Sequence, residues 1–302
     1  MKPARVAWRR VDGVLLLDKP AGMTSNDALQ QVRRLYRAAK GGHTGTLDPF
    51  ATGLLPLCFG EATKFAGELL GSEKRYLATI CLGIATDSGD ATGRPLYRAP
   101  VTVGRAEVEA VLGEFRGEIE QVPPMHSALK RNGKPLYAYA RAGIELERES
   151  RRVFIRELEL RHWQDGQFEL EIACSKGTYV RTLAADLGER LGCGAHLAAL
   201  RRLAIGAFDI NQAVTLDDLQ AMSESERTAR LWPVDALLAE LPIASMGMAD
   251  TRRILHGQGI AWVATSGQRY RLYRDDGQFL GLGAVTADGL LIPRRLVATV
   301  MA

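Results

Sequence analysis

Apolar and polar residues follow two different rhythms along this chain, one with the period of a strand and one with the period of a helix. The strand rhythm is strictest at 168–174, where apolar residues alternate with charged or small ones. The segments 11–17, 76–82 and 153–160 have a similar strand-forming composition. We therefore predict strands at these positions.

The helical rhythm begins after Thr24. Thr24 and Asp27 have the three-residue spacing of a capping box, and apolar residues then recur at helical spacing up to residue 39. Further helices are predicted at 105–115, 182–191 and 215–222. Strands interleaved with a few helices indicate an α+β fold.

The pattern changes near the C-terminal end. From residue 246 onward the apolar stretches become short and strand-like, as at 269–273 and 279–283, with a hairpin turn at 275–277 between them. This predicts a small β-barrel. We therefore expect a domain of residues 1–245, a second domain of residues 246–302, and a linker at 241–245.

Composition sets limits on the class of protein. The chain has 302 residues, of which 46% are hydrophobic and 25% charged, as in a soluble globular protein. The net charge of +4 fits a polyanionic partner without requiring one. The four cysteines form no Cys-x-x-Cys pair and the five histidines are scattered, so we expect no metal site. No apolar run is long enough to span a bilayer, and we expect a cytoplasmic protein.

A glycine-rich segment, 41–55, presents one carboxylate, that of Asp48, between apolar stretches. Glycines before it and Pro49 after it favour an irregular loop. Taken alone, such an aspartate is most simply a turn residue. The loop is no phosphate-binding P-loop, because no Gly-Lys-Ser/Thr follows at the required spacing.

The stretch GHTGTLDPFATGLLPLCFGEATK, residues 42–64, resembles the signature of the bacterial tRNA pseudouridine synthase B family. Four further stretches resemble the same family in the same order: 17–25, 74–76, 175–183 and 200–206. Segments of the C-terminal part resemble the RNA-binding PUA domain of that family: 256–258, 277–281 and 292–296. The resemblance therefore runs over almost the entire chain.

This resemblance implies an α+β catalytic domain on a mixed or antiparallel sheet, followed by a PUA-like β-barrel. It implies an isomerase that converts uridine 55 in the T-arm of tRNAs to pseudouridine. The base is detached from N1, turned, and rejoined through C5 to the same ribose carbon. No electrons or groups enter or leave, so no cofactor is expected. A uridine within folded RNA must be flipped out before it can react.

By resemblance, Asp48 is the nucleophile and Arg181 orients it. An ionised carboxylate can hold one fragment covalently, and an arginine can aim it through two parallel hydrogen bonds. Whether Asp48 attacks the ribose C1′ or the uracil C6 is left open. Tyr76 is expected to stack on the base and to assist removal of the C5 proton.

The resemblance also assigns substrate-binding residues. Tyr179 is expected to line the pocket with Tyr76, Leu200 to supply an apolar wall, and His43 to fill the space that the flipped base vacates. Lys19 is expected to support the catalytic loop. The segment 121–141 resembles the part of the family that approaches the RNA, but no role is assigned to its His126.

Two other functions are weighed. One is a non-catalytic protein that binds or folds tRNA, and the other is an RNA-guided pseudouridine synthase with accessory proteins. We expect a monomeric enzyme whose partner is the tRNA T-arm, with neither a membrane nor a metal involved.

Overall fold

The computed structural model describes residues 7–127 and 129–298. The first half contains β1 (Gly13–Lys19), α1 (Ser25–Tyr36), β2 (Gly41–His43), β3 (Thr52–Phe59), η1 (Gly60–Lys64), α2 (Ala66–Leu70), β4 (Lys74–Leu82), β5 (Ile84–Thr86), β6 (Pro95–Arg98), α3 (Arg105–Leu112), η2 (Gly113–Phe115), β7 (Gly117–Gln121), β8 (Lys130–Arg131), β9 (Lys134–Pro135) and α4 (Leu136–Ala140). The second half contains β10 (Arg151–Gln164), β11 (Gln167–Cys174), α5 (Val180–Arg190), β12 (Ala195–Ile205), β13 (Phe208–Asp209), η3 (Ile210–Gln212), β14 (Val214–Thr215), α6 (Leu216–Ala221), α7 (Glu224–Ala229), η4 (Val234–Leu238), β15 (Ile243–Met246), α8 (Met248–Leu255), β16 (Ile260–Ala261), β17 (Arg269–Arg274), β18 (Phe279–Val285) and β19 (Leu290–Leu296).

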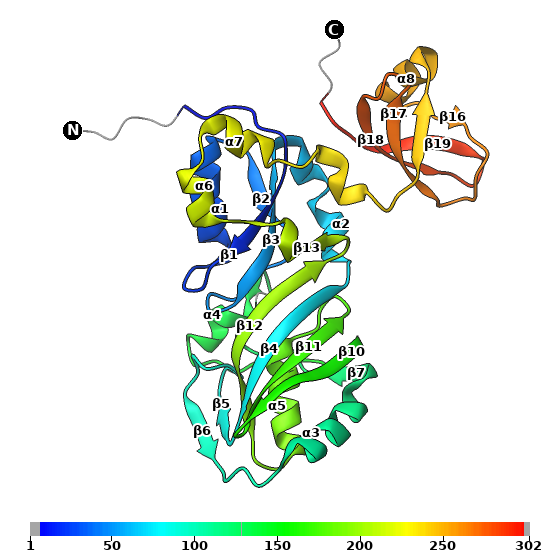
Figure 1. Ribbon diagram of the computed structural model, residues 1–302. Helices are drawn as coiled ribbons and strands as arrows, with labels where there is room; N and C mark the ends of the chain where they lie inside the picture. Colours follow the sequence, from blue (N-terminus) through cyan, green and yellow to red (C-terminus); the bar gives the residue numbers. More distant parts are fainter. Residues whose placement is uncertain (1–6, 128, 299–302) are drawn as a thin grey trace.

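One large mixed sheet organises the N-terminal part of the chain. Its order is β14-β1-β3-β12-β4-β11-β10-β7, with β2 beside β3 and β13 beside β12. Most neighbours are antiparallel, but β14 runs parallel to β1 and β12 runs parallel to β3. Helices flank the strands, with α6 near β1, α1 near β2, α3 near β10 and α5 against β12 (Figure 1). The expected α+β fold on a mixed sheet is confirmed.

A short pairing between β3 and β12 joins the two parts of the sheet. Their parallel pairing spans only Arg201 with Thr52 and Arg202 with Gly53. A side chain at position 53 would collide with the backbone of Arg202, and Gly53 has a φ of +100°, so glycine is needed at this crossing. The glycine-rich segment lies at this junction, and the functional site is therefore built where the two parts of the sheet meet.

The predicted elements lie close to the observed ones. The capping box of Thr24 and Asp27 is present, and α1 ends at Tyr36 because Arg37 adopts a left-handed conformation. The strands predicted at 76–82, 153–160 and 168–174 are parts of β4, β10 and β11. β12 was not predicted as a strand. No helix among the described residues is long and apolar enough to cross a membrane.

The C-terminal part is a five-stranded curled sheet in the order β15-β17-β18-β19-β16, a half-barrel covered by α8 (Figure 1). Its edge strand β15 occupies most of the expected linker, which is a correction: Ile243–Met246 pairs in parallel with β17. Arg271 and Tyr273 of this sheet both contact the carboxylate of Asp235 in η4. The half-barrel is thus tied to the N-terminal part by polar contacts.

Candidate active site

The loop that carries Asp48 is held firmly from the turn that follows β1. The ammonium group of Lys19 is fully buried and donates to the carbonyls of Pro20 at 2.7 Å, Met23 at 2.8 Å and Pro49 at 3.4 Å. Ser25 exchanges hydrogen bonds with both the N–H and the C=O of Leu47. Burial of Lys19 lowers its pKa to about 8. These contacts agree with the supporting role expected for Lys19.

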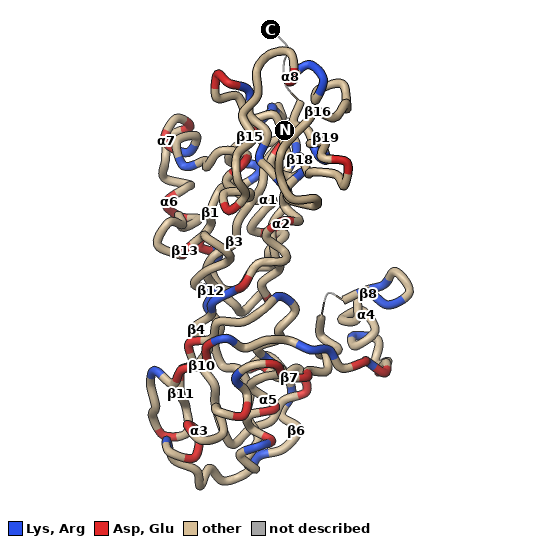
Figure 2. Tube along the Cα trace, turned by 90° about the vertical axis from the view of Figure 1, so that its right-hand side faces the viewer, with Lys and Arg blue, Asp and Glu red and all other residues tan. Residues whose placement is uncertain are grey.

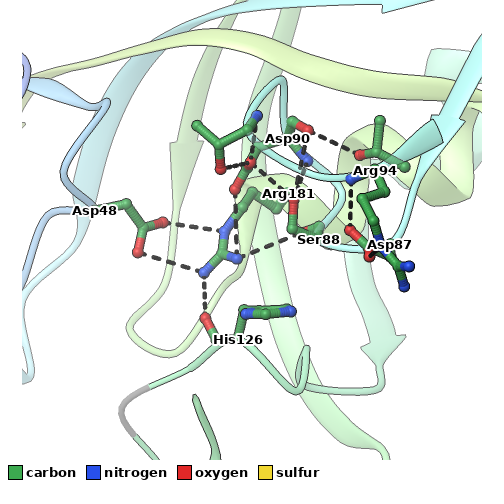
Figure 3. A network of polar contacts seen from close by, with 9 residues as sticks. Asp48, Asp87, Ser88, Asp90, Arg94, His126 and Arg181 are labelled. Carbon is green, nitrogen blue, oxygen red and sulfur yellow. Dashed lines mark hydrogen bonds and ion pairs between the residues drawn. The ribbon is translucent and has the colours of Figure 1, made fainter. Parts of the chain in front are cut away.

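Asp48 and Arg181 form the centre of the site (Figure 3). The Nε of Arg181 lies 3.0 Å from Oδ2 of Asp48, and its Nη2 donates to Oδ1 at 3.4 Å. Arg181 stands in the first turn of α5, is 5% exposed, and also donates to the carbonyl of His126 at 2.7 Å. The guanidinium therefore holds both carboxylate oxygens in the side-on manner that lysine cannot reproduce.

A second carboxylate, that of Asp90, lies on the other side of Arg181. Its Oδ2 is 3.6 Å from Nη1 of Arg181, while its Oδ1 accepts hydrogen bonds from Ser88 and Thr92 (Figure 3). The carbonyl of Ser88 accepts from Arg181 as well. Asp90 was not predicted as a site residue, because nothing in its local sequence indicates that α5 brings an arginine to it.

The electrostatics of Asp48 combine opposing influences. Burial raises the pKa of its carboxyl group, and the negative charge of Asp90 raises it further. The positive charges of Arg181 and Lys19 lower it. The side chain of Asp48 is still 36% exposed, which leaves it accessible from the cavity. The carboxylate is thus both desolvated and reachable, as a nucleophile must be.

A cavity of about 180 Å³ opens beside Asp48. It is lined by the residues predicted for catalysis and for binding, except His43: Asp48, Tyr76, Tyr179, Arg181 and Leu200. A cavity of about 150 Å³ accommodates one benzene ring. The space beside Asp48 therefore has room for one planar base.

His43 lies in a different place. It lines a second cavity of about 600 Å³ that also reaches Asp48 and Arg181, and it is absent from the lining of the smaller one. Burial lowers the pKa of His43, and the charge of Arg202 lowers it further, which favours a neutral ring. The geometry thus places His43 beside Asp48 but outside the base-sized cavity.

The two tyrosines reach the smaller cavity from different elements. Tyr76 stands on β4, opposite Ile172 of β11 and Arg202 of β12. Tyr179 is the N-cap residue of α5; its backbone is held by Gln121, and its ring lies under the guanidinium of Arg151 at 5.5 Å. Two aromatic rings therefore border the cavity that the carboxylate of Asp48 lines.

The segment that the sequence analysis expected near the RNA projects beside the site. Figure 2 shows β8 and α4 standing away from the body of the molecule, with basic residues along them. Tyr137 is 41% exposed, and both it and Arg141 line the larger cavity. His126 accepts a hydrogen bond from Arg181 through its backbone carbonyl and also lines this cavity. Within residues 7–127 and 129–298, no group of His, Cys, Asp or Glu is arranged to hold a metal ion.

Comparisons with known families cover nearly the whole chain. A model described as "TruB family pseudouridylate synthase (N terminal domain)" matches residues 33–180. A tRNA pseudouridylate synthase B C-terminal domain matches residues 181–239, and a pseudouridine synthase II TruB C-terminal model matches residues 242–297.

Curated relatives are similar over the same extent. The tRNA pseudouridine synthase B of Dechloromonas aromatica (strain RCB) is 55% identical over 291 residues, which cover 96% of this chain and 97% of that protein. The tRNA pseudouridine synthase B of Azoarcus sp. (strain BH72) is 55% identical over 295 residues, 98% of each chain.

Solved structures share the fold. A chain of a Cbf5-Nop10-Gar1 complex superposes with a TM-score of 0.71 at 25% identity, covering 93% of this chain and 83% of that one. A chain of an H/ACA RNP bound to a substrate RNA containing 2'-deoxyuridine also gives a TM-score of 0.71, at 23% identity, covering 95% of this chain and 85% of that one.

Proposed function

Since the chain belongs to the TruB family of pseudouridylate synthases, we propose that it converts uridine 55 in the T-arm of tRNAs to pseudouridine. One observation carries the proposal: the carboxylate of Asp48 is gripped by Arg181 at the wall of a cavity of about 180 Å³, with Tyr76 and Tyr179 on its border. The relatives named tRNA pseudouridine synthase B support tRNA as the substrate.

The proposed reaction begins when the target uridine leaves its stack and enters the cavity. Stacking on an aromatic ring returns about 1–3 kcal/mol of the cost of unstacking the base. Tyr76 and Tyr179 supply the aromatic surfaces, and Leu200 supplies an apolar wall. His43 stands in the adjoining cavity, where it can support the RNA that the base has left.

Asp48 then acts as the nucleophile. The carboxylate attacks either C1′ of the ribose or C6 of the uracil, and in both routes the bond between N1 and C1′ breaks while the enzyme retains the pieces. The base turns, its C5 bonds to C1′, and the bond to Asp48 breaks, which regenerates the free carboxylate. Arg181 keeps the carboxylate ionised and directed at the reacting atom through its two donors. Tyr76 assists removal of the proton from C5.

The proposal extends to the setting of the reaction. We place the enzyme in the cytoplasm, as a monomer that needs no cofactor and whose partner is the T-arm of tRNA. We assign catalysis to residues 1–245 and RNA binding to the PUA-like residues 246–302, with the projecting β8–α4 segment as a further RNA contact.

The test uses an unmodified tRNA transcript with the wild-type protein and the variant Asp48→Asn, without cofactor, guide RNA or metal. We expect pseudouridine at position 55 with the wild type and none with the variant, while both bind the transcript with similar affinity. Asp87→Asn is the matched control, because Asp87 pairs with Arg94 at 3.1 Å and has no contact with Arg181 among the described residues.

Other outcomes distinguish the rival functions. A wild type that binds tRNA without modifying it would favour a binding or folding protein. Modification that appears only after a guide RNA is added would favour an RNA-guided enzyme. Pseudouridine at another position would contradict the proposed target.

A further inference from the structure

Arg202 of β12 is the largest fully buried side chain of the described chain, with an exposed fraction of 1%. Its neighbour Arg201 behaves as an ordinary arginine and pairs with both carboxylate oxygens of Asp18, at 3.0 and 2.6 Å. Arg202 has no carboxylate within ion-pair distance among residues 7–127 and 129–298. A buried cation without a counter-ion is costly, so its retention needs a reason.

The hydrogen bonds of Arg202 point to that reason. Its Nε donates to the carbonyl of Leu54 at 2.7 Å, and its Nη2 donates to the carbonyl of Gly45 at 3.1 Å. Leu54 lies on β3, just after the loop of Asp48, and Gly45 lies just before Asp48. Gly45 has a φ of +77°, and a Cβ there would come within 3.3 Å of Nη1. Arg202 thus grips both ends of the catalytic loop.

The same guanidinium reaches Tyr76. The two residues are direct cross-strand partners in the pairing of β12 with β4. Burial raises the pKa of the Tyr76 phenol, whereas the positive charge of the adjacent Arg202 opposes that rise. The charged or titratable groups that face Tyr76 are Arg202 from β12, Cys174 from β11 and Asp48 from the loop. Arg202 in turn lies near the cationic or titratable side chains of Lys19, His43 and Lys74.

We propose that Arg202 is a positioning residue for pseudouridine formation, whose buried guanidinium fixes the Asp48 loop and at the same time orients Tyr76 and stabilises its phenolate. This inference rests on the proposed function, in which Tyr76 takes the C5 proton. After the bond from C5 to C1′ has formed, the phenolate accepts the proton of C5. The C5–H electron pair becomes the C5=C6 bond, and the C6=N1 pair moves onto N1. N1 takes a proton from solvent, and Tyr76 returns its own proton to solvent.

Arginine suits this position better than lysine. Its planar group supplies several donors at fixed angles, so it can bind the carbonyls of Leu54 and Gly45 together and still present its charge to Tyr76, whereas an ammonium is a single flexible point of charge. Arg202→Lys keeps the charge but loses part of the hydrogen bonding. Arg202→Met loses both. The two variants therefore separate charge from geometry.

The experiment measures single-turnover rates on a tRNA transcript across about pH 6 to 10. We expect Arg202→Met to lower the rate near neutral pH by about a hundredfold and to move the alkaline rise of the profile to higher pH, with little change in tRNA affinity. Arg202→Lys should fall between this variant and the wild type. Arg201→Lys on the same strand is the matched control and should retain the wild-type profile. Thermal unfolding shows which variants are folded.

A rescue separates positioning from a purely structural role. A fluorinated tyrosine at position 76 has a more acidic phenol, and it should restore part of the rate of Arg202→Lys and return the profile toward lower pH. Wild-type pH profiles in both Arg202 variants, or no rescue by the fluorinated residue, would overturn the inference. Tyr76→Phe tests the premise separately: if it retains the wild-type rate, the role proposed for Tyr76 is wrong, whatever Arg202 does.

Discussion

At the scale of single residues, the reactivity of Asp48 depends on the competition between burial and Arg181. Burial favours the neutral carboxyl group, and the guanidinium at 3.0 Å favours the anion. Burial is the larger influence, so the pKa of Asp48 lies above its ordinary value. In the proposed reaction the carboxylate must be ionised to act as the nucleophile, so we expect activity to be lost as the pH falls through this raised pKa.

The variant Asp90→Asn tests this balance. Asp90 raises the pKa of Asp48, so its neutralisation should lower that pKa and move the acid limb of the single-turnover rate to lower pH. The plateau should fall by about tenfold to a hundredfold, because Arg181 loses a neighbour that fixes its position and a misplaced catalytic group is costly. The measurement is the rate of pseudouridine formation across about pH 4 to 8. An acid limb that moves upward would contradict this account, and Asp87→Asn again serves as the control.

The residues of the site differ in how far the sequence could reveal them. Asp48, Tyr76, Tyr179, Arg181 and Leu200 stand in stretches that resemble family motifs, and the structure brings them to one cavity. Asp90 and Arg202 act through contacts with residues distant in the sequence, namely Arg181 for the first and Gly45 and Leu54 for the second. No local pattern carries that information, because it arises only when the strands pair.

At the scale of elements, local signals predicted α1 well and missed β12. The capping box and the helical spacing of α1 are complete within its own sequence. β12 contains two adjacent arginines that point to opposite faces of the sheet: Arg202 is buried, and Arg201 lies beside Asp18. Two polar residues in succession interrupt the alternation of apolar and polar positions that marks a strand. A buried arginine looks polar in the sequence, and its burial becomes visible only with its carbonyl partners.

The packing of α5 against β12 gives a prediction at this scale. Replacing glycine by alanine within a helix ordinarily stabilises it by about 1 kcal/mol. A Cβ at Gly188, however, would collide with the backbone and side chain of Ala195, the first residue of β12. We expect Gly188→Ala to lower the free energy of unfolding by about 1–3 kcal/mol and to slow catalysis, since α5 carries Arg181.

The matched control is Gly67→Ala in α2, where a Cβ would meet nothing within 4 Å. This variant should be neutral or slightly stabilising. Urea unfolding of both variants, with the single-turnover rate at saturating tRNA, measures the two effects. Equal stability of the two variants would show that α5 and β12 can shift to accommodate the added Cβ without a loss in the free energy of unfolding.

At the scale of the whole molecule, the sequence predicted the α+β class and a C-terminal β-rich part, but it did not predict how the parts are joined. The segment 241–245 has the composition of a linker, but residues 243–245 belong to β15, an edge strand of the half-barrel. Edge strands are short and pair on one side only, so their sequences carry weak signals. The joining contacts are equally hidden, since they connect η1 and η4 with β17 and β19.

The contact of Asp235 with Arg271 and Tyr273 is the most buried of these, and it yields the last prediction. The side chains of Asp235 and Arg271 are only 10% and 18% exposed, and Oδ2 of Asp235 lies 3.0 Å from Nη1 of Arg271. Removing one partner of a buried pair leaves the other charge uncompensated. Asp235→Ala should therefore loosen the half-barrel, which would appear as faster proteolysis near residues 239–243 and a larger radius of gyration in solution scattering.

The effect of the same variant on catalysis separates RNA binding from chemistry. The pair of Asp48 and Arg181 has no contact with η4 among the described residues, so the single-turnover rate at saturating tRNA should stay at the wild-type value. The KM for tRNA should rise several-fold, because a displaced half-barrel contributes less to binding. Asp276→Asn in the exposed turn of the same sheet is the control, since its ion pair with Arg274 lies on the surface and contributes little to stability. A lower rate at saturation would mean instead that the half-barrel positions the RNA for the reaction as well as holding it.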